Sequence, residues 1–234
     1  CAVEGNLDRT DFRCSFQRIE TAGKQLEKLW NVSKFVSMFE IDVGTENDVE
    51  LMEVDKWIMR EVNNLVNETK AGFAKYDFHN PVVRIMNFVR DDFASNYLEI
   101  VKRRAYNNDE NVNFTTAQKN GAIKTLQYVL GTVLEIMFPV EPALNSFIYK
   151  TLFNEDLTTK PWPEFEEIKS EIVSDDLINF NSSVWKAKKD ASLSLKDEVK
   201  KAIAPSSLTL IEKELCAMHN IKEISFSDKT EITC

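Results

Sequence analysis

The sequence predicts a mainly α-helical chain, in which an antiparallel helical bundle is followed by a small α+β segment. Two observations lead to this prediction. In the first two thirds of the chain, apolar residues recur every three or four positions, which is the period of an amphipathic helix. Short stretches rich in Gly, Pro, Asn and Asp separate these helices, as is typical of neighbours that pack antiparallel. With 234 residues, the chain can form one large or two modest domains.

Four long helices are expected in the bundle. The first spans roughly residues 15–39, and a polar stretch around Gly44 follows it. The second spans roughly 54–76. The third starts near Pro81, which the first turn of a helix tolerates, and ends in the basic triplet at 102–104. Thr115 or Thr116 caps the fourth helix, which ends at the prolines 139 and 142 and is followed by a shorter helix.

The composition changes after Phe153. The stretch "TTKPWPEFEE" contains two of the six prolines and is expected to be an extended linker, and no arginine follows it. A helix is expected from about 174 to 189, a strand in "EVKKAIAP", a helix in "SLTLIEKELCAMHN" and a strand in "IKEISFSD". We therefore expect a short segment over 1–14, the bundle over 15–155 and a small α+β domain over 156–234.

The sequence lacks the usual signatures of a catalytic or metal site. It has no Gly-rich phosphate loop, no H-E-x-x-H and no C-x-x-C. The adjacent carboxylates Asp91 and Asp92 resemble an acid–base pair, but we expect them to pair with Arg84 and Arg90 instead. We therefore expect no catalytic residue and no metal ligand in this chain.

The cysteines and the hydropathy indicate the compartment. Cys1, Cys14, Cys216 and Cys234 are not spaced as a metal clip or a redox pair, and the first residues do not resemble a secretory signal. No apolar run approaches the roughly 18–20 residues of a membrane span. These features predict a reduced, cytoplasmic chain without membrane association.

A basic strip in the first helix suggests RNA binding, although the net charge of the chain is −9. A helical projection of "KQLEKLWNVSKF" places Leu26, Leu29, Trp30 and Ser33 on the core side. The opposite side, facing water, carries Lys24, Lys28, Asn31 and Phe35. Cations beside exposed aromatic rings suit unpaired RNA bases, because the rings stack on the bases while the cations hold phosphates. An ordinary solvated face is the alternative. The other residues expected to contact RNA are Lys34, Phe39, Lys102, Arg103, Arg104, Lys186 and Lys189.

Several segments resemble a known family. "LEKLWNVSKFV" resembles the first helix of the anticodon-binding bundle of class I aminoacyl-tRNA synthetases that handle branched aliphatic amino acids. "DKWIMREVNNLV", "YDFHNPVVRIMNFVRDDFASNYLEIVKRR" and "FTTAQKNGAIKTLQYVLGTVLEIMFPVEP" resemble its second, third and fourth helices, in that order. "FNSSVWKAKKDASLSLKDEV" resembles the C-terminal segment of archaeal-type valyl-tRNA synthetases. Isoleucyl- and leucyl-tRNA synthetases are the alternatives within the family.

The resemblance implies that the chain binds a tRNA, and a tRNA that accepts valine is favoured. The family's ATP-handling signatures, H-I-G-H and K-M-S-K-S, are absent from this sequence. ATP would then be used by a catalytic domain of the same polypeptide, residues 1–14 would be the junction to it, and this chain would need no cofactor and be inactive by itself. Outside the family, the alternative is a helical protein-interaction scaffold, whose binding would not weaken steeply with salt as RNA binding does.

Overall fold

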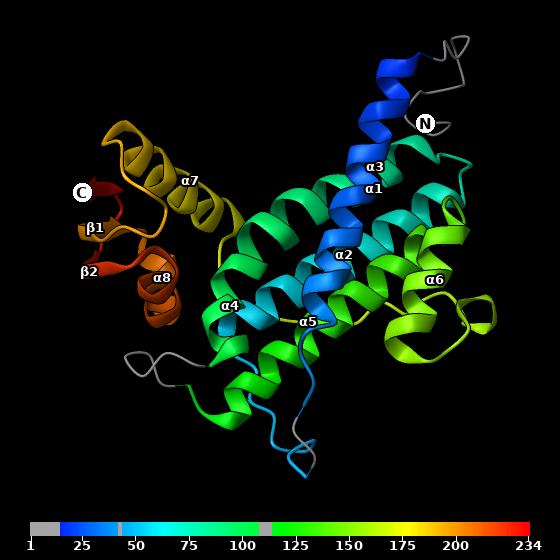
Figure 1. Cartoon of the computed structure of the whole chain (residues 1–234), viewed down its shortest axis with the longest axis horizontal. Helices are drawn as coiled ribbons and strands as arrows, with labels where there is room; N and C mark the ends of the chain where they lie inside the picture. Colours follow the sequence, from blue (N-terminus) through cyan, green and yellow to red (C-terminus); the bar gives the residue numbers. More distant parts are fainter. Residues whose placement is uncertain (1–14, 42–43, 108–113) are drawn as a thin grey trace. The chain divides into compact units, whose positions relative to one another are not determined.

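The computed structural model describes residues 15–41, 44–107 and 114–234, and the expected junction over 1–14 lies outside these ranges. The fold is mainly helical, with a small sheet near the C-terminus (Figure 1). The chain divides into two compact units. Within the described ranges, residues 15–40, 58–94 and 124–168 form the first, and residues 41, 44–57, 95–107, 114–123 and 169–234 form the second. The units therefore interleave along the sequence, whereas we expected a single boundary near residue 155.

The described part of the first unit is mainly helical. It contains α1 (Phe16–Val36), α6 (Pro142–Phe153), α3 (His79–Asn87) and most of α2 (Glu53–Phe73), of the π-helical segment η1 (Phe88–Tyr97) and of α5 (Thr116–Met137). Figure 1 shows α1 crossing α2, α3 and α5. Its core is aliphatic and aromatic, and Leu65, Phe88 and Val133 are at most 1% exposed. The helical period in the sequence therefore predicted the helices of this unit correctly.

The ends of the helices follow from local side-chain chemistry. Thr115 forms a capping box with Gln118: its Oγ1 accepts a hydrogen bond from the Gln118 N–H at 3.1 Å, and its own N–H donates to Gln118 Oε1 at 3.2 Å. Of the two predicted caps, Thr115 is therefore the one used. Pro142 occupies the first position of α6, where its missing N–H costs nothing, and Glu141 accepts from Leu144 N at 2.8 Å.

The third predicted helix has three consecutive parts. These are α3, η1 and α4 (Leu98–Tyr106), which ends at Asn107 in the left-handed conformation with φ of 45°. Ten residues of π-helix are unusual, because such segments are mostly single turns and often lie at functional sites. The π segment rotates the side chains that follow it relative to a regular α-helix, so the sequence period alone misplaces them.

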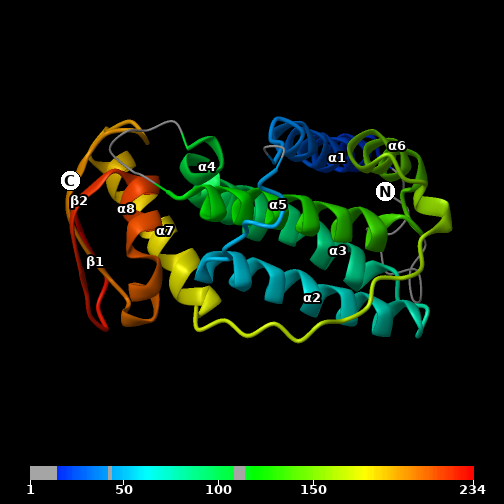
Figure 2. The ribbon, with the colours of Figure 1, turned by 90° about the horizontal axis from the view of Figure 1, so that it is seen from below.

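The proline-rich linker is extended, as predicted. After the short 3-10 turn η2 (Leu157–Thr159), the chain runs along α2, where Glu166 N donates to Asn63 Oδ1 at 3.2 Å (Figure 2). The ring of Trp162 meets that of Phe73 edge-on at 5.8 Å. This part of the linker therefore belongs to the packing of the first unit.

The second unit contains the sheet. Its elements after the linker are α7 (Ser174–Asp190), β1 (Val199–Ala204), η3 (Ser206–Ile211), α8 (Glu212–His219), β2 (Ile221–Phe226) and β3 (Glu231–Thr233). The strand order is β2-β1-β3, with β1 parallel to β2 and antiparallel to β3. Parallel neighbours need a crossover connection, and η3 with α8 supplies it. The predicted strands β1 and β2 are present, and β3 is an addition that the sequence pattern did not indicate.

Two buried polar side chains tie the second unit together. Lys188 donates from Nζ to the carbonyl oxygens of Leu195, Asp197 and His219 at 2.7–2.8 Å. His219 lies against Asn181, with Nε2 and Oδ1 2.8 Å apart. Burial, with the Lys188 charge nearby, lowers the pKa of His219 to about 3. His219 is therefore neutral near pH 7.

None of the helices in the described ranges is long and apolar enough to cross a bilayer.

Candidate nucleic-acid interface

The helix α1 carries the predicted basic strip. Ser15 caps it by accepting a hydrogen bond from Arg18 N at 3.3 Å, and Ser37 ends it. The buried side comprises Ala22, Leu29, Val32, Ser33 and Val36. This side fixes the rotation of the helix, so side chains about 180° away point to solvent.

The predicted solvent face is largely confirmed. Lys24, Lys28, Asn31 and Lys34 are exposed, and Phe35 is half-buried. Phe39, in contrast, is only 7% exposed, and its ring meets that of Phe35 edge-on at 4.9 Å between centroids. The prediction of Phe39 as a stacking platform is therefore wrong, because α1 ends at Val36 and the following turn directs this ring inward. Phe39 supports Phe35 from behind.

Trp30 also lies differently from the prediction. It is half-buried instead of belonging to the core, and its ring is 6.0 Å from that of Phe147, which is 58% exposed. Lys34 Nζ lies 5.3 Å from the centre of the Trp30 ring, within reach of a cation–π interaction. An aromatic surface with an attached cation therefore adjoins the basic strip on α1.

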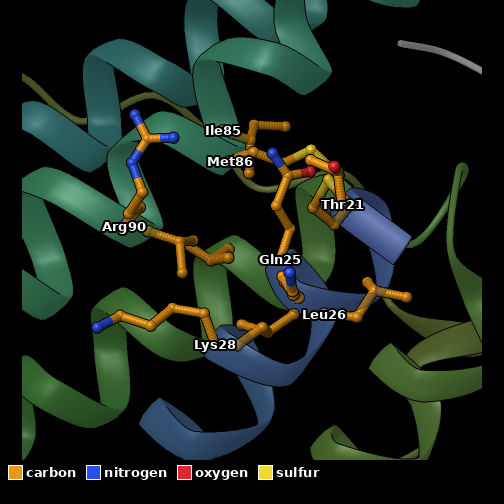
Figure 3. A pocket seen from close by; sticks show the side chains of 12 residues that line it. Thr21, Gln25, Leu26, Lys28, Ile85, Met86 and Arg90 are labelled. Carbon is orange, nitrogen blue, oxygen red and sulfur yellow. The ribbon is translucent and has the colours of Figure 1, made fainter. Parts of the chain in front are cut away.

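A cavity of about 310 Å³ opens beside the strip (Figure 3). Its walls come from α1, from α3 with the first residues of η1, and from α5. We call it the α1 groove, and its lining residues are Thr21, Lys24, Gln25, Leu26, Lys28, Leu29, Ile85, Met86, Val89, Arg90, Val133 and Met137. The floor is apolar, and three cations, Lys24, Lys28 and Arg90, stand around it. Arg90 brings a cation from η1 to a strip that the sequence had placed on one helix.

The three cations differ in how far they are neutralised. Lys24 pairs with Glu20 at 2.8 Å, and Arg90 pairs with Asp91 at 2.7 Å. No carboxylate within the described ranges forms an ion pair with Lys28. Exposed pairs of this kind contribute only about 0–1 kcal/mol, so they can open to an incoming anion. Lys28 is the cation most readily available to a phosphate.

The other predicted contacts belong to the second unit. Lys186 and Lys189 are exposed on α7. On α4, Lys102 pairs with Glu99 at 3.4 Å and Arg103 is half-buried. These four side chains stay candidates for phosphate contact.

Arg104 cannot contact RNA. Its side chain and that of Asp55 are both 0% exposed, and Arg104 Nη1 donates to Asp55 Oδ2 at 2.7 Å. A second bond joins Nη2 to Oδ1 at 2.5 Å, and Tyr97 donates to the same Oδ1 at 2.7 Å. Burial alone would lower the pKa of Arg104, but the charge and hydrogen bonds of the Asp55 carboxylate outweigh it, and the pKa is raised. The prediction is corrected: Arg104 is the cation of a buried ion pair.

The side chains that could take part in catalysis are held in ion pairs or are buried. Asp91 and Asp92 pair with Arg90 and Arg84 as predicted, at 2.7 and 3.3 Å, and burial raises the pKa of Asp92. Cys216 lies three residues before His219, but burial raises the pKa of its thiol to about 11 and leaves it unreactive. In the described ranges, no group of three or more His, Cys, Asp and Glu could hold a metal ion.

The sequence of the chain is similar to a known family of tRNA-binding domains. Residues 55–203 match the family model described as the anticodon-binding domain of tRNA ligase. The chain belongs to this family. The matched residues begin within α2, so α1 lies before them. The match ends within β1, so it covers parts of both units and leaves α8, β2 and β3 outside it. The relatives below extend the similarity over α1.

Relatives named valine–tRNA ligase match most of the chain. The protein from Nanoarchaeum equitans is 28% identical over 214 residues, which are 91% of this chain and 26% of the relative. The protein from Pyrobaculum aerophilum is 27% identical over 231 residues, 95% of this chain and 28% of the relative. The protein from Ehrlichia ruminantium is 32% identical over 226 residues, 89% of this chain and 27% of the relative. This anticodon-binding domain thus spans little more than a quarter of the length of these relatives.

Proposed function

We propose that this chain binds tRNA at the anticodon stem and loop, as the tRNA-gripping part of a valine–tRNA ligase. The observation that carries the proposal is the α1 groove, an apolar cavity with Lys24, Lys28 and Arg90 at its edge and Phe35 further along the same helix. Cations hold phosphates, and an aromatic ring offers a stacking surface to an unpaired base. The valine specificity rests on the names of the relatives.

The activity of the whole ligase would then require parts beyond this chain. Valine and ATP would be bound by a catalytic domain of the same polypeptide, and this chain would supply affinity and recognition without a cofactor. The absence of the two ATP-handling signatures from the sequence supports this division. We expect the isolated chain to show no ATP–pyrophosphate exchange with valine.

The test is a binding titration of the full 234-residue chain against a panel of tRNA transcripts at two salt concentrations. Lys28→Ala should weaken binding of every tRNA about equally and lower the salt slope by about one unit, because one phosphate contact is lost. Lys24→Ala should have a smaller effect, since Glu20 already neutralises part of its charge. Lys70→Ala is the matched control, an exposed lysine on α2 outside the groove.

Phe35→Ala tests the stacking surface separately. It should cost about 1–3 kcal/mol in binding and leave the salt slope unchanged, because stacking releases no counterion. A protein-interaction scaffold would show no salt-dependent tRNA binding, and Lys28→Ala would then behave like Lys70→Ala. That pattern would refute the proposed function.

A further inference from the structure

The α1 groove contains a buried acceptor without a donor. Gln25 points from α1 into the space between α1 and α3, toward Met86 (Figure 3). Its Oε1 is buried and accepts no hydrogen bond from any residue in the described ranges. The nearby hydroxyl of Thr21 donates to Gln17 O at 2.9 Å, so its proton is committed elsewhere. An unsatisfied buried acceptor costs roughly 1–3 kcal/mol, which calls for an explanation.

The surroundings of Gln25 restrict the chemistry of a ligand. Leu29, Ile85 and Val89 are buried and form an apolar floor. Met86 and Met137 add thioethers, which adapt their shape and make favourable contacts with aromatic rings. The complementary group is therefore flat and apolar on its faces, with an N–H on its edge for Gln25 Oε1. The cations at the edge of the groove further require a negative charge attached to that group.

We propose that the α1 groove takes up one unstacked nucleobase of the bound RNA and that Gln25 accepts a hydrogen bond from the edge of that base. Lys28, with Lys24 and Arg90, then holds the phosphates on either side. This inference rests on the proposed function and assigns one base to one cavity. The volume of about 310 Å³ lies at the small end of the roughly 300–1,000 Å³ typical of ligand sites, which suits a single base better than a helix or a lipid chain.

The charge distribution favours RNA over a protein segment as the occupant. A peptide helix in an apolar groove needs contacts spaced over several turns. Here three cations surround a cavity of single-residue dimensions, on a chain whose net charge is −9. Glu20 and Asp91 pair with two of these cations, but the pairs are exposed and weak, so a phosphate can replace the carboxylates. Cations clustered on one face of a negatively charged chain are the electrostatic footprint of a nucleic-acid contact.

The first experiment uses Gln25→Leu, which keeps the side-chain volume and removes the amide. The variant should melt at the same temperature as the wild type or higher, because an unsatisfied buried acceptor is gone. It should bind an RNA hairpin with the anticodon stem and loop of a valine tRNA about five- to tenfold more weakly. Gln127→Leu is the matched control, a half-buried glutamine on α5 that lines a different cavity.

The second experiment removes the base instead of the amide. A series of hairpins, each lacking one loop base, should contain a member that binds the wild type about tenfold more weakly than the intact hairpin. For Gln25→Leu, the loss of that base should weaken binding much less, because the variant already lacks the hydrogen bond to the base. Met86→Trp, which fills the groove, should mimic the loss of the base while its circular dichroism shows that the chain is folded.

The outcomes separate this inference from the proposed function. If the wild type binds no hairpin in a salt-dependent manner, the proposed function fails. If the wild type binds normally but Gln25→Leu and Met86→Trp, both folded, keep full affinity for the intact hairpin, the groove holds no base and only the inference is overturned. Retained RNA affinity together with loss of a copurifying protein partner on Met86→Trp would assign the groove to a protein segment and also overturn it.

Discussion

The buried pair of Arg104 and Asp55 allows the sharpest prediction about stability. In Arg104→Met, Asp55 keeps hydrogen bonds from Tyr97 at 2.7 Å and from Met52 N at 2.9 Å, but it loses both bonds to the guanidinium. A carboxylate stranded in this way costs about 3–5 kcal/mol. Since about 1 kcal/mol lowers the melting temperature by roughly 2–4 °C at this chain length, we expect a decrease of roughly 6–20 °C.

Thermal unfolding followed by circular dichroism measures this decrease. Arg103→Met is the matched control, because it removes the preceding, half-buried cation of the same basic triplet. Replacing Asp55 by Leu together with Arg104→Met should recover part of the loss, since neither charge is then left unpaired. If Arg104→Met melts together with the Arg103→Met control, the buried pair does not carry the stability assigned to it.

The same variant also tests the corrected role of Arg104. At a temperature where it is folded, Arg104→Met should bind tRNA with unchanged affinity and salt slope, because its side chain is 0% exposed in the wild type. A decrease in the salt slope like that expected for Lys28→Ala would return Arg104 to the RNA surface.

Two further predictions concern stability. Both carboxylate oxygens of Glu214 are buried without a hydrogen-bond partner in the described ranges, and burial raises its pKa above the reference value of 4.5. Between pH 4.5 and the folded-state pKa, the unfolded chain binds fewer protons than the folded chain, so the free energy of unfolding should fall as pH rises through that window. Glu214→Gln should remove this fall and should be more stable than the wild type at neutral pH. A pH-stability profile that is the same in both proteins would contradict this. A Cβ at Gly121 would lie 2.1 Å from the carbonyl oxygen of Glu50, so Gly121→Ala should lower the melting temperature. A Cβ at Gly23 would meet no atom within 4 Å, so Gly23→Ala should stabilise the chain by roughly 1 kcal/mol through helix propensity. Equal melting temperatures for the two variants would refute the close approach at Gly121.

The sequence predicted most of the helices because their signal is local. Apolar period, capping residues and prolines act within one or two turns, and they placed α1, α5 and α7 close to their observed ends. The same period gave the exposure of Lys28 and Asn31 correctly, because rotation by about 100° per residue fixes the direction of each side chain within a regular helix.

The errors occurred where a local rule was applied beyond its range. Phe39 was projected as if α1 continued past Val36, where the helix ends. Arg104 was grouped with its neighbours as a basic run, although three consecutive helical residues point in three directions. It shares a face with Ile100 and Val101, both at most 1% exposed, and that spacing was the available signal of its burial.

The α1 groove could not be predicted from the sequence, because it depends on contacts between distant segments. Met86 and Arg90 reach it from α3 and η1, and Val133 from α5. The π-helical geometry of η1 shifts the register of Arg90 relative to the α-helix before it, and no periodic pattern encodes that shift. Gln25 had no signal either, since its importance comes from the absence of a donor in its folded surroundings.

The structure divides the expected RNA affinity into two parts with different physical origins. The cations at the edge of the groove contribute a salt-dependent part, which is limited because Glu20 and Asp91 already neutralise two of them and the chain as a whole is negative. Long-range repulsion from the net charge is screened beyond about 8–10 Å at physiological salt, so the cations in contact with phosphate decide the outcome there. The apolar floor and Phe35 contribute a part that salt does not change. A chain with net charge −9 can therefore hold a polyanion if most of its specificity comes from bases rather than from phosphates, and this is why the groove, more than the total of lysines, is the feature to test.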